Sequence, residues 1–145
     1  MPQSAHKFAL ELEERIVSDP ALIAPVRQSV ERLALEAGFT AKTAGEVGLC
    51  VNEALANVMR HAYAGHTDRP IHLKAHYDPD SGELNIRIRD WGSGINPDTL
   101  PPKPKQLDPL QPGGLGLICL RRMMGAVVFT PQPDGMLLTM TRRKG

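Results

Sequence analysis

Hydrophobic and polar residues alternate with two different periods in the first part of the chain. In HKFALELEER the large apolar side chains fall at every second position, and this period of two predicts a half-buried strand. From residue 22 to 37 the apolar positions follow a helical spacing instead. Ser18-Asp19-Pro20 is typical of a helix start, and Gly38 suits a left-handed cap at the other end. The pattern therefore predicts a strand and then a helix of about five turns.

The same two periods continue along the chain. A second helix is predicted over 40–65, because apolar residues keep a helical spacing until a glycine near the end of that range. IHLKAHY and ELNIRIRD then each alternate apolar and polar residues, and the turn formers DPDSG lie between them. These two segments are predicted to form an antiparallel hairpin.

Residues 96–112 break this regular pattern. Six of the thirteen prolines lie in this stretch and no periodicity survives, which is typical of a functional lid or a disordered segment. GGLGL follows and opens LICLRRMMGAV, an apolar run predicted to be a helix with a glycine-rich first turn. The chain closes with a second predicted hairpin over 127–143, with PQPDG as its turn.

The order of these elements defines a fold class. It predicts an α+β fold, a two-layer α/β sandwich in which about three helices cover one face of a mixed, mainly antiparallel sheet. With 145 residues, 41% of them hydrophobic, the chain fits a single domain over residues 1–145. The stretch 96–112 is the expected lid of that domain.

Composition argues against several classes of partner. Seventeen Lys and Arg against sixteen Asp and Glu give a net charge of +1, which disfavours direct binding to nucleic acid or to a membrane surface. The basic C-terminal TRRKG is interpreted as a solvated tail. The chain shows no membrane-spanning stretch or signal peptide, so the cytoplasm is its expected location. Cys50 and Cys119 lie in apolar patterns and are expected to be buried structural thiols.

One predicted helix carries an unusual polar stripe. Within VNEALANVMRHAY, the residues Glu53, Asn57 and His61 are four apart and therefore share one face of the helix. An amide oxygen suits Mg²⁺, and a neighbouring carboxylate can polarise a hydroxyl or a water. A plain solvated face is the alternative, because polar residues on helix exteriors are common.

Two glycine-rich segments follow the stripe. In Asp90-Trp91-Gly92-Ser93-Gly94 an acid at a strand end precedes alternate glycines, and its carboxylate can accept a hydrogen bond from an exocyclic amine such as that of adenine. A plain β-turn is the alternative there. In GGLGL, residues 113–117, backbone amides at a helix N-terminus can face phosphate. This segment matches neither the Walker A pattern nor that of a dinucleotide fold.

The three motifs, taken in order, resemble those of the GHKL ATPase superfamily, which includes the ATP-binding domains of gyrase, histidine kinases and MutL. ExxxNxxxH corresponds to its N box, DxGxG to its first glycine box, and GxG after the lid to its second. The resemblance covers roughly residues 40–140. Over its whole length the chain looks like the small stand-alone anti-sigma serine kinases of the RsbW type. The resemblance implies a Bergerat-type ATP-binding fold that uses ATP and Mg²⁺.

The resemblance also implies a role for each motif residue. Glu53 would act as general base on the acceptor hydroxyl, Asn57 would coordinate Mg²⁺, and Asp90 would recognise the adenine amino group. Lys103 and Lys105 are the lid cations expected to neutralise charge on the phosphates. The other residues expected to contact or shape the ATP pocket are His61, Gly92, Gly94, Ile95, Gly114, Leu115, Gly116 and Leu117.

Two functions from different classes remain open. The leading hypothesis is an ATP-dependent serine/threonine kinase that sequesters a sigma factor, phosphorylates a small STAS-type antagonist and forms a homodimer. The alternative is a non-kinase ATP-sensing module that binds another signalling protein. A split histidine kinase is disfavoured, because no helix with a phosphoacceptor His precedes the motifs. Relatives commonly carry Thr after the glycine of the last hairpin turn, where it supports adenine, whereas here Gly135 is followed by Met136.

Overall fold

The fold is taken from a computed structural model that describes residues 10–92 and 116–144, without the side chains of 116–119. In chain order its elements are β1 (Glu11–Val17), the 3₁₀ helix η1 (Pro20–Leu22), α2 (Ile23–Glu36), α3 (Ala41–Asn57), the π-helix η2 (Val58–Ala62), β2 (Pro70–Asp78), β3 (Glu83–Asp90), α4 (Gly116–Met124), β4 (Ala126–Gln132) and β5 (Gly135–Arg143). The predicted order of strands and helices is confirmed. None of these described helices is long and apolar enough to cross a membrane.

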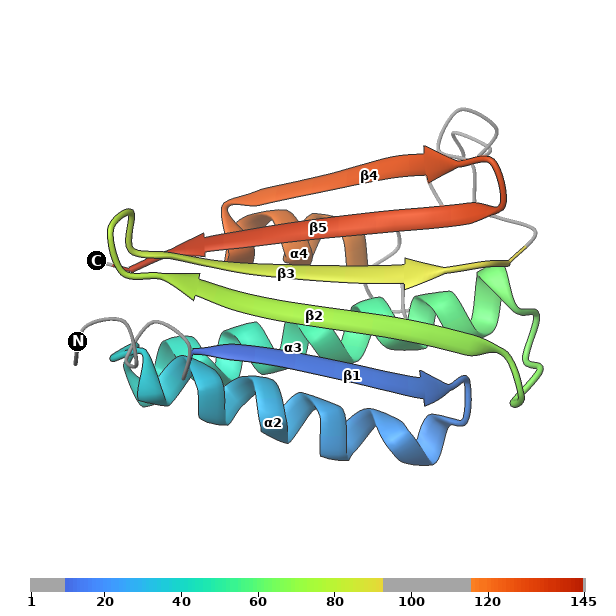
Figure 1. The fold of residues 1–145 in the computed structure, drawn as a ribbon, viewed down its shortest axis with the longest axis horizontal. Coiled ribbons are helices and arrows are strands. Elements are labelled where there is room, and N and C mark those ends of the chain that lie inside the picture. Colours follow the sequence, from blue (N-terminus) through green and yellow to red (C-terminus); the bar gives the residue numbers. More distant parts are fainter. Residues whose placement is uncertain (1–9, 93–115, 145) are drawn as a thin grey trace.

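The five described strands form one sheet in the order β1-β2-β3-β5-β4. All four neighbouring pairs are antiparallel, so the described sheet has no parallel pair although the sequence allowed for one. The reason is that β5 lies between β3 and β4, which run in the same direction and would pair in parallel as neighbours. The helices α2, α3 and α4 lie on one face of the sheet (Figure 1), and the α+β two-layer class is confirmed.

Local capping signals place the two long helices. The Asp19 carboxylate accepts a hydrogen bond from the Ala21 amide at 2.9 Å and starts η1, which leads into α2. After α2 the chain turns at Gly38, whose φ of +98° is the left-handed conformation that its sequence position predicts. Thr40 Oγ1 accepts from the Thr43 amide at 3.1 Å and caps α3. Both helices therefore begin where the sequence predicts.

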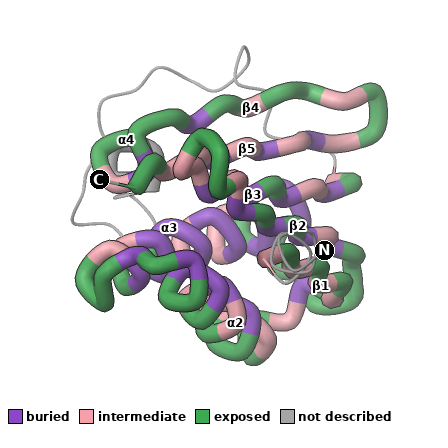
Figure 2. The backbone as a smooth tube through the Cα atoms, turned by 60° about the vertical axis from the view of Figure 1, so that its left-hand side comes forward, coloured by how far each residue is buried: buried purple, intermediate pink, exposed green. Residues whose placement is uncertain are grey.

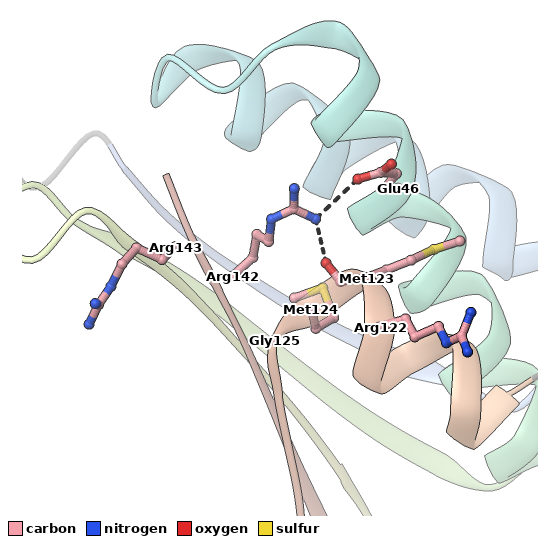
Figure 3. Close-up of a pocket in the computed structure, with 7 residues that line it drawn as sticks. All are labelled: Glu46, Arg122, Met123, Met124, Gly125, Arg142 and Arg143. Atoms are coloured by element: carbon pink, nitrogen blue, oxygen red, sulfur yellow. Dashed lines mark hydrogen bonds and ion pairs between the residues drawn. The ribbon is translucent and has the colours of Figure 1, made fainter. Parts of the chain in front are cut away.

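The basic residues at the C-terminus are part of the fold, and the prediction of a solvated tail was wrong. The ammonium group of Lys144 donates to the Ala37 carbonyl at 2.7 Å, next to the end of α2. Arg142, in β5, pairs with Glu46 of α3 at 3.1 Å and also donates to the Met123 carbonyl near the end of α4 (Figure 3). Cations are stabilised at the C-terminal ends of helices because unpaired carbonyl groups gather there.

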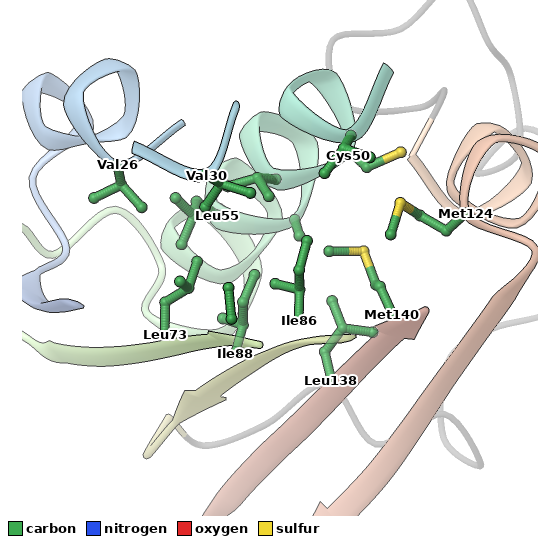
Figure 4. Packing of buried hydrophobic residues seen from close by; sticks show 14 of the residues in the cluster. Val26, Val30, Cys50, Leu55, Leu73, Ile86, Ile88, Met124, Leu138 and Met140 are labelled. Atoms are coloured by element: carbon green, nitrogen blue, oxygen red, sulfur yellow. The ribbon is translucent and has the colours of Figure 1, made fainter. Parts of the chain in front are cut away.

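The hydrophobic core fills the space between the helices and the sheet. Side chains from α2 and α3 meet inward-facing side chains of β2, β3 and β5 (Figure 4). The largest completely buried ones include Val30, Val51, Leu55, Leu73, Ile86, Ile88 and Met140. Cys50 lies in this core as predicted, whereas the side chain of Cys119 is not described. Buried positions are concentrated between the two layers (Figure 2), and alternate residues of β2 and β3 face away from them.

Candidate functional site

The second long helix changes its hydrogen-bond pattern directly after Asn57. Val58–Ala62 form a π-helix, so the Tyr63 amide donates at 3.0 Å to the carbonyl of Val58, five residues earlier. Ala64, with a φ of +51°, follows and ends the helical conformation. No signal in the sequence predicts this wide turn, because the apolar spacing continues through it without interruption. π-Turns are rare and are frequently found at functional sites.

The three residues of the polar stripe have different surroundings. Glu53 and Asn57 are half-buried, and Glu53 Oε1 is shielded from solvent without a hydrogen-bond partner in the described parts of the chain. Oδ1 of Asn57 accepts a hydrogen bond from Arg60 at 2.8 Å. His61 is more exposed; partial burial of its ring lowers its pKa, and the charge of Arg60 lowers it further. The stripe is therefore more than a uniformly solvated helix face.

Asp90 ends β3 as a buried carboxylate. The residue is only 3% exposed, and its Oδ1 accepts a hydrogen bond from the Gly92 amide at 3.0 Å. Burial raises the pKa of Asp90, while the Gly92 amide, the charge of Arg89 and the Met136 amide partly oppose that rise. A carboxylate has lone pairs for about four hydrogen bonds, so Asp90 retains acceptor capacity for a further donor.

Asn57 and Asp90 line the same cavity, which lies between the end of α3, η2, α4 and the β3-β5-β4 side of the sheet. Its remaining walls are apolar and consist of Ala54, Val58, Ala62, Leu120, Phe129, Met136 and Leu138. Leu120, Phe129 and Leu138 were not predicted as site residues, because apolar periodicity does not distinguish a cavity wall from the core. Two of the three sequence motifs thus meet in space, and Met136 lies beside them.

Two glycines allow the backbone around Asp90 to pack closely. A side chain at Gly92 would overlap the Ala62 carbonyl oxygen, so β3 can approach η2 only if this residue is glycine. A side chain at Gly135 would overlap the Asp90 carbonyl oxygen, and Gly135 has a φ of +155°. The family resemblance implies a pocket-shaping role for Gly92, whereas the sequence predicts only a turn at Gly135.

The remaining predicted site residues have no described side chain. Gly94, Ile95, Lys103, Lys105, Gly113, Gly114 and Leu115 lie outside the described residues, as does the whole predicted lid over 96–112. Gly116 and Leu117 begin α4, but only their backbone is described. Over the described ranges, no three His, Cys, Asp or Glu side chains gather into a group that could hold a metal ion.

A second cleft lies at the opposite end of α3. It is lined by Glu46, Arg122, Met123, Met124, Gly125, Arg142 and Arg143 (Figure 3). Arg142 is paired with Glu46, and Arg143 pairs with Glu83 at 2.8 Å. The side chains of Arg122 and Arg143 point in different directions away from Arg142 (Figure 3). These cations do not converge on one point, so the cleft lacks the geometry of an anion site.

Comparison with known protein families identifies the family to which the chain belongs. The family described as histidine kinase-like ATPase domain matches residues 16–142. The chain therefore belongs to the histidine kinase-like ATPase family, and the predicted resemblance is confirmed. Membership of this family implies that the nucleotide is ATP.

Individual relatives define the class more closely. Serine/threonine-protein kinase BtrW of Bordetella bronchiseptica is 32% identical over 77% of this chain and 79% of its own length. Serine-protein kinase RsbW of Listeria innocua is 26% identical over 94% of this chain and 86% of its own length. The predicted likeness to RsbW-type serine kinases is thus confirmed.

A solved structure shares the fold. It contains the RsbU and RsbW domains of a Mycobacterium tuberculosis protein, and it matches this chain with a TM-score of 0.68 and 16% identity. The match covers 92% of this chain but only 32% of that longer chain. At this level of identity the match supports the fold and carries no argument about individual site residues.

Proposed function

We propose that the protein is a cytoplasmic ATP-dependent serine/threonine kinase that sequesters a sigma factor and phosphorylates a small STAS-type antagonist. The observation that carries this proposal is the cavity shared by Asn57 and Asp90. It combines an acceptor for a base with an amide oxygen suited to a metal–phosphate group. The serine/threonine kinases to which the chain is similar support the reaction class.

Asp90 is proposed to recognise the base. Its carboxylate is buried and is oriented by a hydrogen bond from Gly92, so accepting a further bond from the adenine amino group requires little rearrangement. The cavity walls are apolar and suit the faces of a flat ring, and the cavity must widen to admit one. Met136 contributes a polarizable thioether in place of a hydroxyl, and it therefore favours the base by packing and not by hydrogen bonding.

Asn57 fits the role of a magnesium ligand. Its Oδ1 is a neutral, hard oxygen atom on a residue that lines the cavity, and phosphate and water oxygens would complete the coordination shell. Bound Mg²⁺ would neutralise charge on the phosphates. Arg60 donates to this same oxygen atom at 2.8 Å, and the second lone pair of the oxygen remains for a metal.

Glu53 fits the role of general base. It precedes Asn57 by four residues, so the two side chains are neighbours on α3. Its Oε1 has no hydrogen-bond partner among the described residues and can accept a proton. In the proposed reaction the acceptor hydroxyl oxygen bonds to the γ-phosphorus as the bond to ADP breaks, and the hydroxyl proton passes to Glu53.

A homodimer is part of this proposal. Within the described sheet β1 is an edge strand, and unpaired backbone groups along an edge can pair across a two-fold axis. Sedimentation of the purified protein tests this, because a monomer at all concentrations would exclude the dimer.

The kinase proposal is tested by following phosphate in a lysate of the organism from which the chain comes. Purified protein is added with γ-labelled ATP, and we expect one small protein to become labelled on serine or threonine, as mass spectrometry would establish. Glu53→Gln removes the proposed base with little change in shape, so label transfer should fall at least about a hundredfold while ATP binding persists. ATP binding without label transfer by the unmodified protein would favour the non-kinase ATP sensor.

A further inference from the structure

Tyr63 makes two hydrogen bonds through one buried hydroxyl group. The residue directly follows η2 and is 5% exposed. Its hydroxyl donates to the Pro70 carbonyl at 2.5 Å and accepts from the Trp91 amide at 2.7 Å. A buried tyrosine hydroxyl generally needs such partners, but a single partner would have been enough. Tyr63 therefore connects the start of β2 to the residue that follows β3.

The Trp91 amide held by Tyr63 is adjacent in sequence to Asp90. The next amide, that of Gly92, donates to the Asp90 carboxylate at 3.0 Å. Gly92 is in turn packed so closely against Ala62 that a side chain would not fit. The backbone that orients the Asp90 carboxylate is thus fixed by two consecutive residues, Ala62 and Tyr63.

The π-helix determines where these two residues lie. In η2 the Tyr63 amide donates to the Val58 carbonyl, whereas continuation as an α-helix would pair it with the Met59 carbonyl. That change would rotate Ala62 and Tyr63 about the helix axis relative to the end of β3. The wide turn therefore supplies the geometry in which both residues contact the segment after Asp90.

The hydroxyl stays protonated in this position. Burial raises the pKa of Tyr63, and the negative charge of Asp90 also raises it. The bond from Trp91 and the charges of Arg89 and Arg69 act in the opposite direction without reversing the shift. Tyr63 can therefore keep donating to Pro70 while it accepts from Trp91.

We propose that Tyr63 is a positioning residue for recognition of the nucleotide base. Its hydroxyl, placed by η2, holds the Trp91 amide and so keeps the Asp90 carboxylate directed at an exocyclic amino group on the base. This inference rests on the proposed function, because it assigns a determinant of base specificity to the proposed ATP site.

The test compares Tyr63→Phe with Ser18→Ala. Ser18 is 1% exposed, and its hydroxyl donates to the His66 carbonyl at 2.5 Å and accepts from the Arg69 amide at 3.0 Å. The Ser18 hydroxyl thus also donates one hydrogen bond and accepts another, and both partners lie in the loop after η2. Neither partner belongs to the segment 90–92. The two variants remove equivalent hydrogen bonds and differ in whether the segment after Asp90 is involved.

The measured quantity is a ratio of two dissociation constants obtained by calorimetry with Mg²⁺ present. One ligand is ATP, and the other is purine riboside triphosphate, which lacks only the exocyclic amino group. The unmodified protein should prefer ATP. Tyr63→Phe should reduce this preference about threefold to tenfold, because it weakens the binding of ATP. Ser18→Ala should leave the preference unchanged, although it should lower thermal stability about as much as Tyr63→Phe does.

The outcomes distinguish this inference from the proposed function. The positioning role would be overturned if Tyr63→Phe kept the full preference for ATP, or if Ser18→Ala lost as much of that preference as Tyr63→Phe. No preference for ATP in the unmodified protein would instead count against the proposed function itself. If Tyr63→Phe does not fold, Tyr63→3-fluorotyrosine keeps the hydroxyl but weakens it as an acceptor; a reduced preference then supports the inference and an unchanged one overturns it.

Discussion

The two ends of α3 use polar side chains in opposite ways. At the Glu46 end, Arg142 is paired with a carboxylate and also with the Met123 carbonyl. At the Asn57 end, Glu53 has a shielded oxygen without a described partner, and Asp90 is buried beside apolar cavity walls. Arg142 is thus satisfied within the fold at one end, whereas Glu53 keeps an acceptor without a described partner at the other.

This difference is a physical reason to place the candidate site at the Asn57 end of α3. Buried polar groups without partners cost stability, so such groups need an explanation other than stability. Glu53 Oε1 is such a group, and a substrate hydroxyl that donates a hydrogen bond to it is one such explanation. The paired arginine at the other end needs no ligand, which agrees with the divergent cations of that cleft (Figure 3).

The largest effect is expected when the Asp90 carboxylate is altered. Asp90→Asn replaces part of the acceptor surface with an amide donor that faces the adenine amino group. ATP affinity should fall about a hundredfold, because a charged acceptor is lost and two donors oppose each other. Calorimetry with Mg-ATP measures this, and affinity within about twofold of the unmodified protein would contradict the base-recognition role.

The pH dependence of stability provides a control that needs no nucleotide. Burial raises the pKa of Asp90 above 3.8, so its ionised form destabilises the fold. This penalty is absent below pH 3.8 and grows as the pH rises through the raised pKa. The unfolding free energy of Asp90→Asn relative to the unmodified protein should therefore increase with pH over that window. Urea denaturation measures it, and a constant difference would show that burial of Asp90 has no effect on its titration.

Close packing at the site end predicts the next effect. Gly92→Ala places a methyl group too close to the Ala62 carbonyl oxygen, so η2 and the end of β3 must separate. Stability should fall by about 1–3 kcal/mol, and ATP binding should weaken because the Gly92 amide moves away from Asp90. Urea denaturation and calorimetry test both parts. Normal stability in this variant would mean that the two segments are free to move apart.

The sequence predicted local features better than those that depend on distant contacts. The caps at Asp19 and Thr40 involve residues two or three positions apart, so a short pattern contains the whole interaction. The bond between Tyr63 and Trp91 joins residues 28 positions apart, and no local pattern encodes it. The same holds for the π-helix, whose apolar spacing is also compatible with an α-helix. Motif order located Asn57 and Asp90, but their shared cavity depends on the position of β5 beside β3.

At the satisfied end, loss of a polar side chain should affect stability but not binding. Arg142→Met keeps much of the aliphatic length and removes the bonds to Glu46 and Met123. Stability should fall by about 1–2 kcal/mol, because the pair is partly shielded and the Met123 carbonyl loses its donor. ATP affinity should stay unchanged, because Arg142 is not among the residues that line the cavity. A large loss of ATP affinity without unfolding would show that the two ends are coupled.

The smallest effect is expected at Gly45, which precedes Glu46 in α3. A methyl group there meets nothing within 4 Å, and an interior helix position does not require glycine. Gly45→Ala should therefore stabilise the fold by about 0.5–1 kcal/mol, because alanine has the higher helix propensity. Gly48→Ala is the matched control in the same helix, since its methyl group would displace the Glu31 carboxylate from Arg27. Thermal unfolding should show a smaller gain for Gly48→Ala, and equal gains would mean that the contact between α2 and α3 adapts without cost.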